Sequence, residues 1–161
     1  MLGEAGIRRL TAEDWAGFRD IRLRALADAP SAFGSTLAWA QARTEQDWRR
    51  LLAQRAQFLA SAGGVDIGTV GGLDDVERDG AHLISMWVAP EARGTGVSGL
   101  LMRAVIAWAA EAGYRAVWLE VSDGNTAAER LYLRHGFVRT GVHGPIAEGD
   151  PRLEFEMVRR L

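Results

Sequence analysis

Residues 83–137 decide the fold of this chain and read LISMWVAPEARGTGVSGLLMRAVIAWAAEAGYRAVWLEVSDGNTAAERLYLRHGF. The apolar run LISMWV (83–88), which stops at Ala89-Pro90, has the composition of a short strand. After the turn ARGTG (92–96), apolar residues recur at helical spacing from Val97 to Ala112, and Gly113 stands where glycines end helices. AVWLEV (116–121) predicts a second strand. Two strands joined by a long helix predict a βαβ unit with parallel strands.

The turn at residues 92–96 has the features of a phosphate-binding site. Gly94 and Gly96 lack a Cβ, so the backbone can approach a ligand closely. The turn opens directly into the helix, whose first N–H groups have no partner within it, and Arg93 adds a positive charge. Glycine-rich turns also join strands to helices where no ligand binds, so this pattern alone is weak.

Two familiar phosphate loops can be compared with this turn. The Walker loop needs Gly-Lys followed by Ser or Thr, which is missing here. Gly94, Gly96 and Gly99 match the dinucleotide pattern G-x-G-x-x-G, and Glu120 supplies an acidic residue on the next strand. NAD binding is therefore a weaker alternative, because a dinucleotide domain usually begins with this unit and repeats it.

Composition limits the class of protein. A chain of 161 residues predicts one domain spanning residues 1–161. Its net charge of −2 argues against nucleic-acid or membrane partners, and no apolar run is long enough to span a membrane. The first residues lack the hydrophobic region of a secretory signal, so we expect a cytoplasmic protein. No cysteine is present and three scattered histidines give no ligand spacing, so we expect no metal. All 19 basic residues are arginine, which together with many alanines suggests a bacterial genome rich in GC.

The rest of the chain completes a predicted element order of βααβββαβαββ. Before residue 83 we expect a strand at 7–10, helices from Trp15 to Leu26 and after Thr44, and strands at 58–62 and 65–73. After residue 137 we expect strands at 138–142 and 153–158, joined by a loop at 143–152. This order indicates an α/β domain with a mixed sheet and helices on both faces.

Two parts of residues 83–137 resemble the GCN5-related N-acetyltransferase (GNAT) family. The family signature for acetyl-coenzyme A (acetyl-CoA) is [Q/R]-x-x-G-x-[G/A] between a strand and a helix. Arg93 and Gly96 match it, whereas Ser98 replaces the last small residue. The later part looks like the family's next helix, through Asn125, Ala127-Ala128, Leu131-Tyr132 and Gly136-Phe137. The spacing of Glu120 and Tyr132 is similar to the bacterial branch that acetylates the N-terminal alanine of a ribosomal protein.

The resemblance implies a mostly antiparallel central sheet whose two parallel strands splay apart at one end. The pantetheine arm of acetyl-CoA would lie in this split, where only strand backbone would contact it and the side chains of Met86 and Val88 would be core. Family members often pair through their last strands, so a homodimer is one expectation. The implied cofactor-binding residues are Met86, Trp87, Val88, Arg93, Gly94, Thr95, Gly96, Val97, Ser98, Gly99, Asn125 and Tyr132.

Tyr132 is the candidate catalytic acid for acetyl transfer to an amine. A phenol has a pKa of ~10, so it is protonated at neutral pH and can donate to the leaving thiolate. The alternative is a tyrosine that only packs against the sheet, and the two roles are compatible. We expect Thr126 and Glu129 to form a capping box that begins this helix and leaves Asn125 free for the cofactor.

Glu120 is the candidate base because it is the one charged residue in AVWLEV. Burial there would raise its pKa towards the range of a general base. It shares a strand face with Trp118, opposite Val117, Leu119 and Val121. Alternatively, Glu120 points into solvent or pairs with an arginine, and water relays the proton. His82 and Ser85 are secondary candidates.

In the implied fold the acceptor site lies between the loops at 30–39 and 143–152. Its candidate residues are Phe33, Trp39, His143, Glu148 and Asp150, whose carboxylates would attract an amine unless they only form a turn. The sequence thus predicts an acetyl-CoA-dependent N-acetyltransferase that works by direct attack in a ternary complex, since no cysteine could form an acyl-enzyme. The acceptor is a small-molecule amine or a peptide N-terminus. The alternative is a non-catalytic acyl-CoA-binding module.

Overall fold

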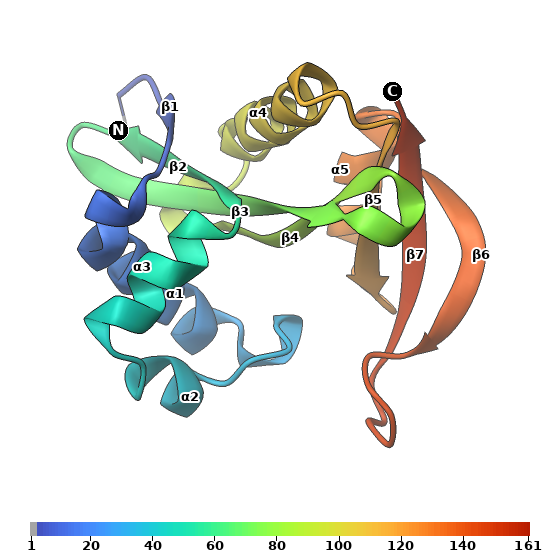
Figure 1. Ribbon diagram of the computed structural model, residues 1–161, viewed down its shortest axis with the longest axis horizontal. Helices are drawn as coiled ribbons and strands as arrows, with labels where there is room; N and C mark the ends of the chain where they lie inside the picture. Colours follow the sequence, from blue (N-terminus) through green and yellow to red (C-terminus); the bar gives the residue numbers. More distant parts are fainter. Residues whose placement is uncertain (1–2) are drawn as a thin grey trace.

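A computed structural model describes residues 3–161, whose strands form one seven-stranded sheet of order β1-β2-β3-β4-β5-β7-β6 (Figure 1). The strands are β1 Gly6–Arg9, β2 Ala56–Ala62, β3 Val65–Asp75, β4 Gly80–Val88, β5 Ala116–Ser122, β6 Val138–Pro145 and β7 Leu153–Arg160. The helices are α1 Trp15–Asp28, α2 Leu37–Gln41, α3 Glu45–Ala53, α4 Val97–Glu111 and α5 Thr126–Arg134. Among these helices none is both long and apolar enough to cross a membrane.

The strand pairing confirms the predicted fold class. β4 and β5 pair parallel, and the other five strand pairs of the sheet are antiparallel. The element order differs from the prediction by one short helix, α2, in the stretch expected to be a loop or a partly helical turn. Thr36 begins α2 because its side chain accepts a hydrogen bond from the backbone N–H of Trp39 at 3.1 Å. The strand β6 also extends beyond its predicted end and includes His143.

The helices cover both faces of the sheet (Figure 1). On one face α1, α2 and α3 enclose a core built around Phe18 and Trp48, whose rings meet edge to face at 5.5 Å. On the other face α4 and α5 pack on the central strands through residues such as Leu101 and Tyr132. The four longer helices, α1, α3, α4 and α5, therefore bury apolar residues in these two cores, which accounts for the amphipathic patterns in the sequence.

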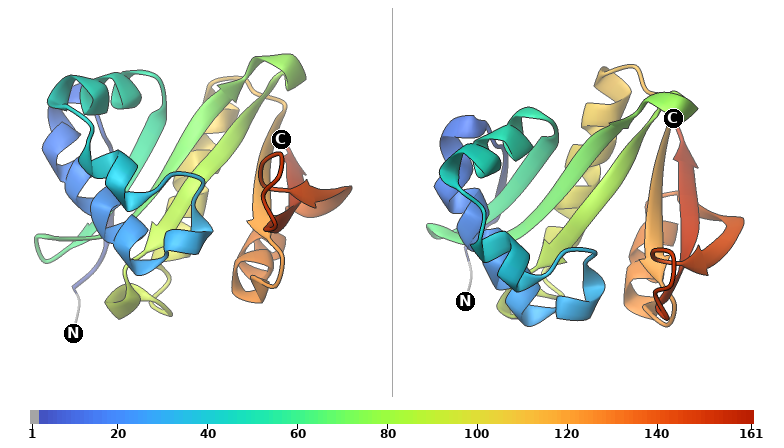
Figure 2. Two further views of the ribbon diagram at one scale, coloured as in Figure 1. Left: turned by 90° about the horizontal axis from the view of Figure 1, so that it is seen from below. Right: turned by 60° about the horizontal axis from the view of Figure 1, so that its bottom comes forward.

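The two parallel strands separate soon after they begin. Their ladder contains only the pairs Ala81–Val117 and His82–Trp118, and Figure 2 shows β4 diverging from β5 beyond this point. Gly80 allows the close approach at the joined end, because a Cβ there would overlap the Trp118 ring. From residue 83 onward, the edge of β4 that faces β5 has no strand partner.

A β-bulge bends β4 where it separates from β5. Thr69 pairs with Trp87 and Gly71 pairs with Ile84, so one residue of β3 faces two residues of β4. Ser85 in this bulge has a φ of 55°, in the left-handed region that a serine rarely adopts. Bulges and strained residues of this kind concentrate at functional sites.

Candidate active site

A groove of about 650 Å³ runs along the separated part of β4 to the start of α4 and across to α5. Most of the residues expected at the cofactor line it. They are Met86, Trp87, Val88, Arg93, Gly94, Gly96, Val97, Ser98 and Asn125, together with Ala92, Ala127, Ala128, Leu131 and Arg134. Three expected residues do not line the groove. The Thr95 hydroxyl donates to the carbonyl of Ala92, Gly99 faces Arg103 and His135, and Tyr132 lines an adjoining cavity instead.

The start of α4 presents backbone donors to this groove. Gly94 and Gly96 have φ values of 79° and 90°, which favour glycine, and no side chain caps the helix. The first N–H groups of a helix lack intrahelical acceptors and carry the positive end of the helix dipole. The arrangement therefore suits a phosphate or pyrophosphate.

Arg93 is held in place rather than projecting freely into the groove. Its Nε donates to the carbonyl of Val88 at 3.1 Å, and its Nη2 donates to Asp28 at 2.6 Å. Asp28 at the end of α1 also accepts from the indole N–H of Trp87 at 3.0 Å. The bonds from Trp87 and then Arg93 lower the pKa of Asp28. The sequence patterns did not indicate a role for Asp28, because it lies far from Arg93 along the chain.

Asn125 begins α5, which corrects the expected capping by Thr126. Its Oδ1 accepts a hydrogen bond from the backbone N–H of Ala128 at 3.2 Å. Asn is among the best N-cap residues, and here it stands one position ahead of the expected Thr126–Glu129 box. Glu129 instead binds Arg139 at 2.6 Å. Asn125 still lines the groove, although its side-chain oxygen is engaged by the helix.

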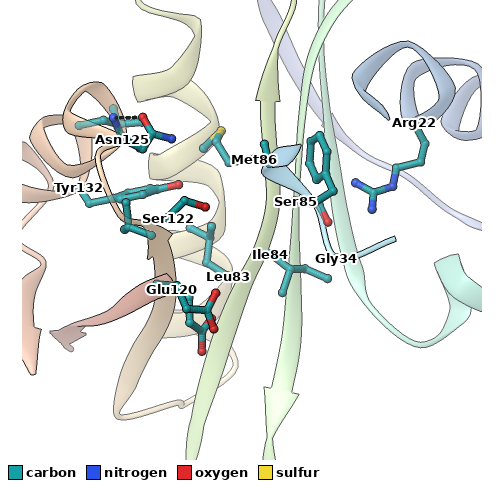
Figure 3. A pocket seen from close by; sticks show the side chains of 16 residues that line it. Arg22, Gly34, Leu83, Ile84, Ser85, Met86, Glu120, Ser122, Asn125 and Tyr132 are labelled. Carbon is teal, nitrogen blue, oxygen red and sulfur yellow. Dashed lines mark hydrogen bonds between the residues drawn. The ribbon is translucent and has the colours of Figure 1, made fainter. Parts of the chain in front are cut away.

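A second cavity of about 320 Å³ adjoins the groove (Figure 3). Four residues line both spaces: Met86, Asn125, Ala128 and Leu131. The second cavity also meets the bulge of β4 at Ser85 and the side of β5 at Glu120 and Ser122. The two spaces therefore adjoin, and together their lining extends from the start of α4, past the bulge, to residues of α1 and the following loop.

Tyr132 lies near the place where the two spaces meet. Its side chain is buried against Phe137, and Figure 3 shows its hydroxyl pointing towards Met86. Burial raises the pKa of Tyr132 to about 12. Within residues 3–161 this hydroxyl has no hydrogen-bond partner, so it can donate to a group that enters the cavity.

Glu120 is exposed, so the expected burial of this carboxylate was wrong. The alternation along β5 is as predicted, with Val117, Leu119 and Val121 buried on the other face. Instead of an arginine, Glu120 binds Nε2 of His82 at 2.5 Å. This hydrogen bond raises the pKa of His82, and the other ring nitrogen lies 4.0 Å from Asp75.

Glu154 is a carboxylate of the same cavity that the sequence did not reveal. It lies on β7 opposite Ser122 and forms no ion pair with another described residue. Desolvation, followed by the charge of Glu120, raises the pKa of Glu154. The alternating pattern of β7 could have placed it on an outward face, but only the strand register brings it beside Glu120.

The expected acceptor residues are not brought together. Phe33 lines the second cavity, whereas Trp39 is exposed on α2 and stacks against Arg43 at 3.9 Å. His143 is in β6 and binds Asp123 at 2.8 Å, and Glu148 is exposed in the loop between β6 and β7; neither lines this cavity.

The two loops expected to flank the site do meet. Arg152 binds Asp150 at 2.7 Å and donates to the carbonyl of Ser31 at 3.3 Å. The sequence also missed Arg22 of α1, which lines the second cavity. No group of three possible metal ligands occurs in the described part of the chain.

Comparisons with known proteins agree with this geometry. The model of the acetyltransferase (GNAT) family matches residues 15–137. The probable N-acetyltransferase family 8 member 5 of Mus musculus is 36% identical over 101 residues, which are 60% of this chain and 44% of that protein. The IAA acetyltransferase of Azospirillum brasilense is 31% identical over 122 residues, which are 76% of this chain and 75% of that protein.

Solved structures share the fold. The protein yncA from Salmonella typhimurium, solved with its cofactor acetyl-CoA, superimposes with a TM-score of 0.75 at 22% identity, and the match covers 99% of this chain and 95% of that chain. The chain thus spans less than half of the mouse relative but nearly the whole of this structure. Because the family model matches residues 15–137, which are more than half of the chain, the chain belongs to the GNAT acetyltransferase family.

Proposed function

We propose that this chain moves an acetyl group from acetyl-CoA to a primary amine by direct attack in a ternary complex. The observation that carries this proposal is the separation of β4 from β5, which joins a groove at the start of α4 to a second cavity. A donor in the groove and an acceptor in the cavity would meet beside Tyr132. The relatives, which are named as acetyltransferases, support the same reaction.

The residues present fit acetyl-CoA. The backbone N–H groups at Gly96, Val97 and Ser98 would bind its pyrophosphate, since Gly94 and Gly96 leave room for the close approach. The unpaired edge of β4 beyond Leu83 would bind the amides of the pantetheine arm as an adjacent strand does. Acetyl-CoA, when bound, would supply an activated thioester as the acetyl donor.

The carboxylates of the second cavity would receive the amine. Glu120 and Glu154 attract a cationic amine electrostatically. The bound cationic amine must first lose a proton to Glu120, Glu154 or a water held by them, which frees the lone pair that attacks the acetyl carbon. Once the nitrogen–carbon bond has formed, the nitrogen loses a second proton by the same route. His82, bound to Glu120 and near Asp75, would stabilise the charge of Glu120 and connect it towards solvent.

Tyr132 would stabilise the leaving sulfur. The carbon–sulfur bond breaks as the nitrogen–carbon bond forms, and its electron pair goes to the sulfur. A phenol whose pKa is raised to about 12 holds its proton more firmly than a thiol of pKa ~8.5. We therefore assign Tyr132 as a hydrogen-bond donor to the developing thiolate, which finally takes its proton from solvent.

A small-molecule amine fits this site better than a peptide N-terminus. The second cavity holds about 320 Å³, and Arg152 joins the β6–β7 loop to the carbonyl of Ser31 beside it. An extended peptide would need an open groove on this side. The rival from another class, a non-catalytic acyl-CoA-binding module, gives no reason for the connected second cavity or for an unpartnered tyrosine hydroxyl there.

Two measurements test the proposed function. Calorimetric titration should show micromolar binding of acetyl-CoA and no binding of NAD. A thiol-release assay with a panel of primary amines should then show acetyl transfer that saturates in both substrates without a burst. Binding of NAD instead, or of neither, would refute our interpretation of the groove. Binding of acetyl-CoA without transfer to any amine would favour the binding module.

We also propose that the chain forms a homodimer. β6 is an edge strand of the sheet, and its Val138 and Val142 are exposed, so it offers a surface for a second copy. Sedimentation equilibrium would give the mass directly. A dimer that Val142→Glu converts to a monomer would support pairing through β6, and a wild-type monomer at micromolar concentration would exclude it.

A further inference from the structure

The second cavity has a cationic side chain on the wall opposite the carboxylates. Arg22 of α1 points towards this cavity from the far side of β4, whereas Glu120 lies on the side of β5 (Figure 3). Its guanidinium lies 4.5 Å from the centre of the Phe33 ring, and its Nη2 donates to the hydroxyl of Ser35 at 2.9 Å. Stacking and this bond hold the guanidinium in one orientation.

The charge of Arg22 is not neutralised. Its Nη1 is buried and has no hydrogen-bond partner, and no ion pair joins Arg22 to a carboxylate within residues 3–161. Arg55 lies close enough to repel it and is itself without a carboxylate partner in the described chain, with a buried, unbonded Nε. Burial, followed by the charge of Arg55, lowers the pKa of Arg22 to about 10, so it remains cationic at neutral pH.

A buried cation without a counter-ion is unfavourable, because its lost hydration is not replaced. A purely structural arginine would be expected to use its remaining donors on protein acceptors. Arg22 instead keeps an unneutralised charge and one donor without an acceptor, and its side chain lines the second cavity together with Phe33 and Ile84. The missing acceptor is therefore expected to arrive with the substrate.

We propose that the acceptor is an amino-acid-type molecule, an amine that also carries a carboxylate, with the carboxylate on Arg22 and the amine beside Glu120 and Glu154. This inference rests on the proposed acetyl transfer and names its substrate class. The planar guanidinium matches a carboxylate in shape and donor geometry. The cavity volume of about 320 Å³ limits the size of this acceptor.

Matched acceptors test this assignment. Leucine, methionine and phenylalanine are compared with their carboxamides, which keep the amine and the side chain but lose the negative charge. For wild type, kcat/KM should be roughly 10- to 100-fold higher for the acid than for the amide, the range expected for hydrogen bonds to a charged group. Arg22→Met should abolish this preference mainly through KM, and Arg22→Lys should keep part of it.

Arg19→Met is the matched control, because it removes an arginine from the same helix that lines none of the described cavities. It should keep the wild-type preference. Thermal unfolding checks the fold: Arg22→Met should not lower Tm, since it replaces an unpaired buried charge with an apolar chain of similar length. Equal kcat/KM for every acid and its amide, or the same preference in Arg22→Met, would overturn the assignment.

A binding measurement separates this inference from the proposed function. Calorimetry can measure the Kd of each free acid and each amide for wild type and for Arg22→Met in the absence of acetyl-CoA. Tighter binding of the acids that is lost in Arg22→Met supports the carboxylate site even if acetyl transfer fails. Absence of any acid preference rejects the site even if acetyl-CoA binds and other amines react. Preference for an aminoalkyl phosphate over the matched carboxylate would also reject it.

Discussion

Tyr132→Phe is the sharpest test of how the site works, because it removes one oxygen atom. The hydroxyl has no partner among the described residues, so its loss leaves no protein group unsatisfied. The ring keeps its contact with Phe137, whose centroid lies 6.0 Å away. We therefore expect the free energy of unfolding to change by less than about 0.5 kcal/mol and the Kd for acetyl-CoA to stay near the wild-type value.

Turnover should fall strongly in the same variant. Removing one preorganised donor to a developing anion typically lowers kcat by about 100- to 1000-fold, or roughly 3–4 kcal/mol of transition-state stabilisation. The loss should appear in kcat, since the thiolate exists only as the bond breaks. Because the pKa of Tyr132 is raised to about 12, its titration should not shape the wild-type pH–rate profile below about pH 10.

The assay has a built-in control, since the chain contains only two tyrosines. Tyr114 packs against Trp108 with ring centroids 5.4 Å apart, and it lines neither the groove nor the second cavity. Tyr114→Phe should keep wild-type kcat. Thiol release under saturating substrates, with calorimetry for acetyl-CoA, measures both variants. Wild-type turnover in Tyr132→Phe would refute the role of the hydroxyl, and a parallel loss of acetyl-CoA binding would show that it only supports the groove.

Gly96→Ala should weaken acetyl-CoA binding by at least tenfold and destabilise the fold by ~1–2 kcal/mol, because its φ is 90°; Gly113→Ala, at 83° and away from the groove, should destabilise equally without affecting binding. Glu120→Gln removes the partner that raises the pKa of His82. The raised pKa of His82 stabilises the folded protein fully at pH values below the unfolded-state pKa, and this stabilisation is lost as pH rises through the folded-state pKa. The Tm difference between wild type and Glu120→Gln should therefore be largest near about pH 6 and shrink at higher pH. A Tm difference that stays constant with pH would contradict this coupling. At Ser85, with φ of 55°, glycine should be more stable than alanine by roughly 1 kcal/mol in chemical denaturation, and the reverse order would show that the bulge stores no strain.

Local sequence patterns were sufficient for most of the fold and for most of the residues that line the groove at the start of α4. The alternation in residues 116–121, the helical spacing after Val97 and the glycines at 94 and 96 each act within one element or one turn. A glycine at the start of a helix has the same conformational freedom wherever the helix lies, so the phosphate site could be predicted before any contact was known. The family resemblance added that the two parallel strands separate.

The predictions from sequence were wrong where two neighbouring residues could play the same role or where burial depended on a distant strand. Both Asn125 and Thr126 can cap a helix, and the structure begins α5 one residue earlier than the capping-box pattern indicated. The carboxylate of Glu120 was expected to be buried because its strand is apolar, but its face of β5 is partly exposed where β4 turns away. A one-dimensional pattern contains neither the neighbouring cap nor the separation of the next strand.

The sequence by itself determined most of the elements and the glycine-rich turn at the start of α4, because backbone conformation and amphipathic spacing are local properties. Only the tertiary structure decided which charged groups line the second cavity. Glu154 reaches Glu120 through the register of β7 on β5, and Arg22 reaches the same cavity from α1 on the other side of β4. Charges act through space and not along the chain, so the chemistry of the acceptor site follows from how the sheet and α1 pack together.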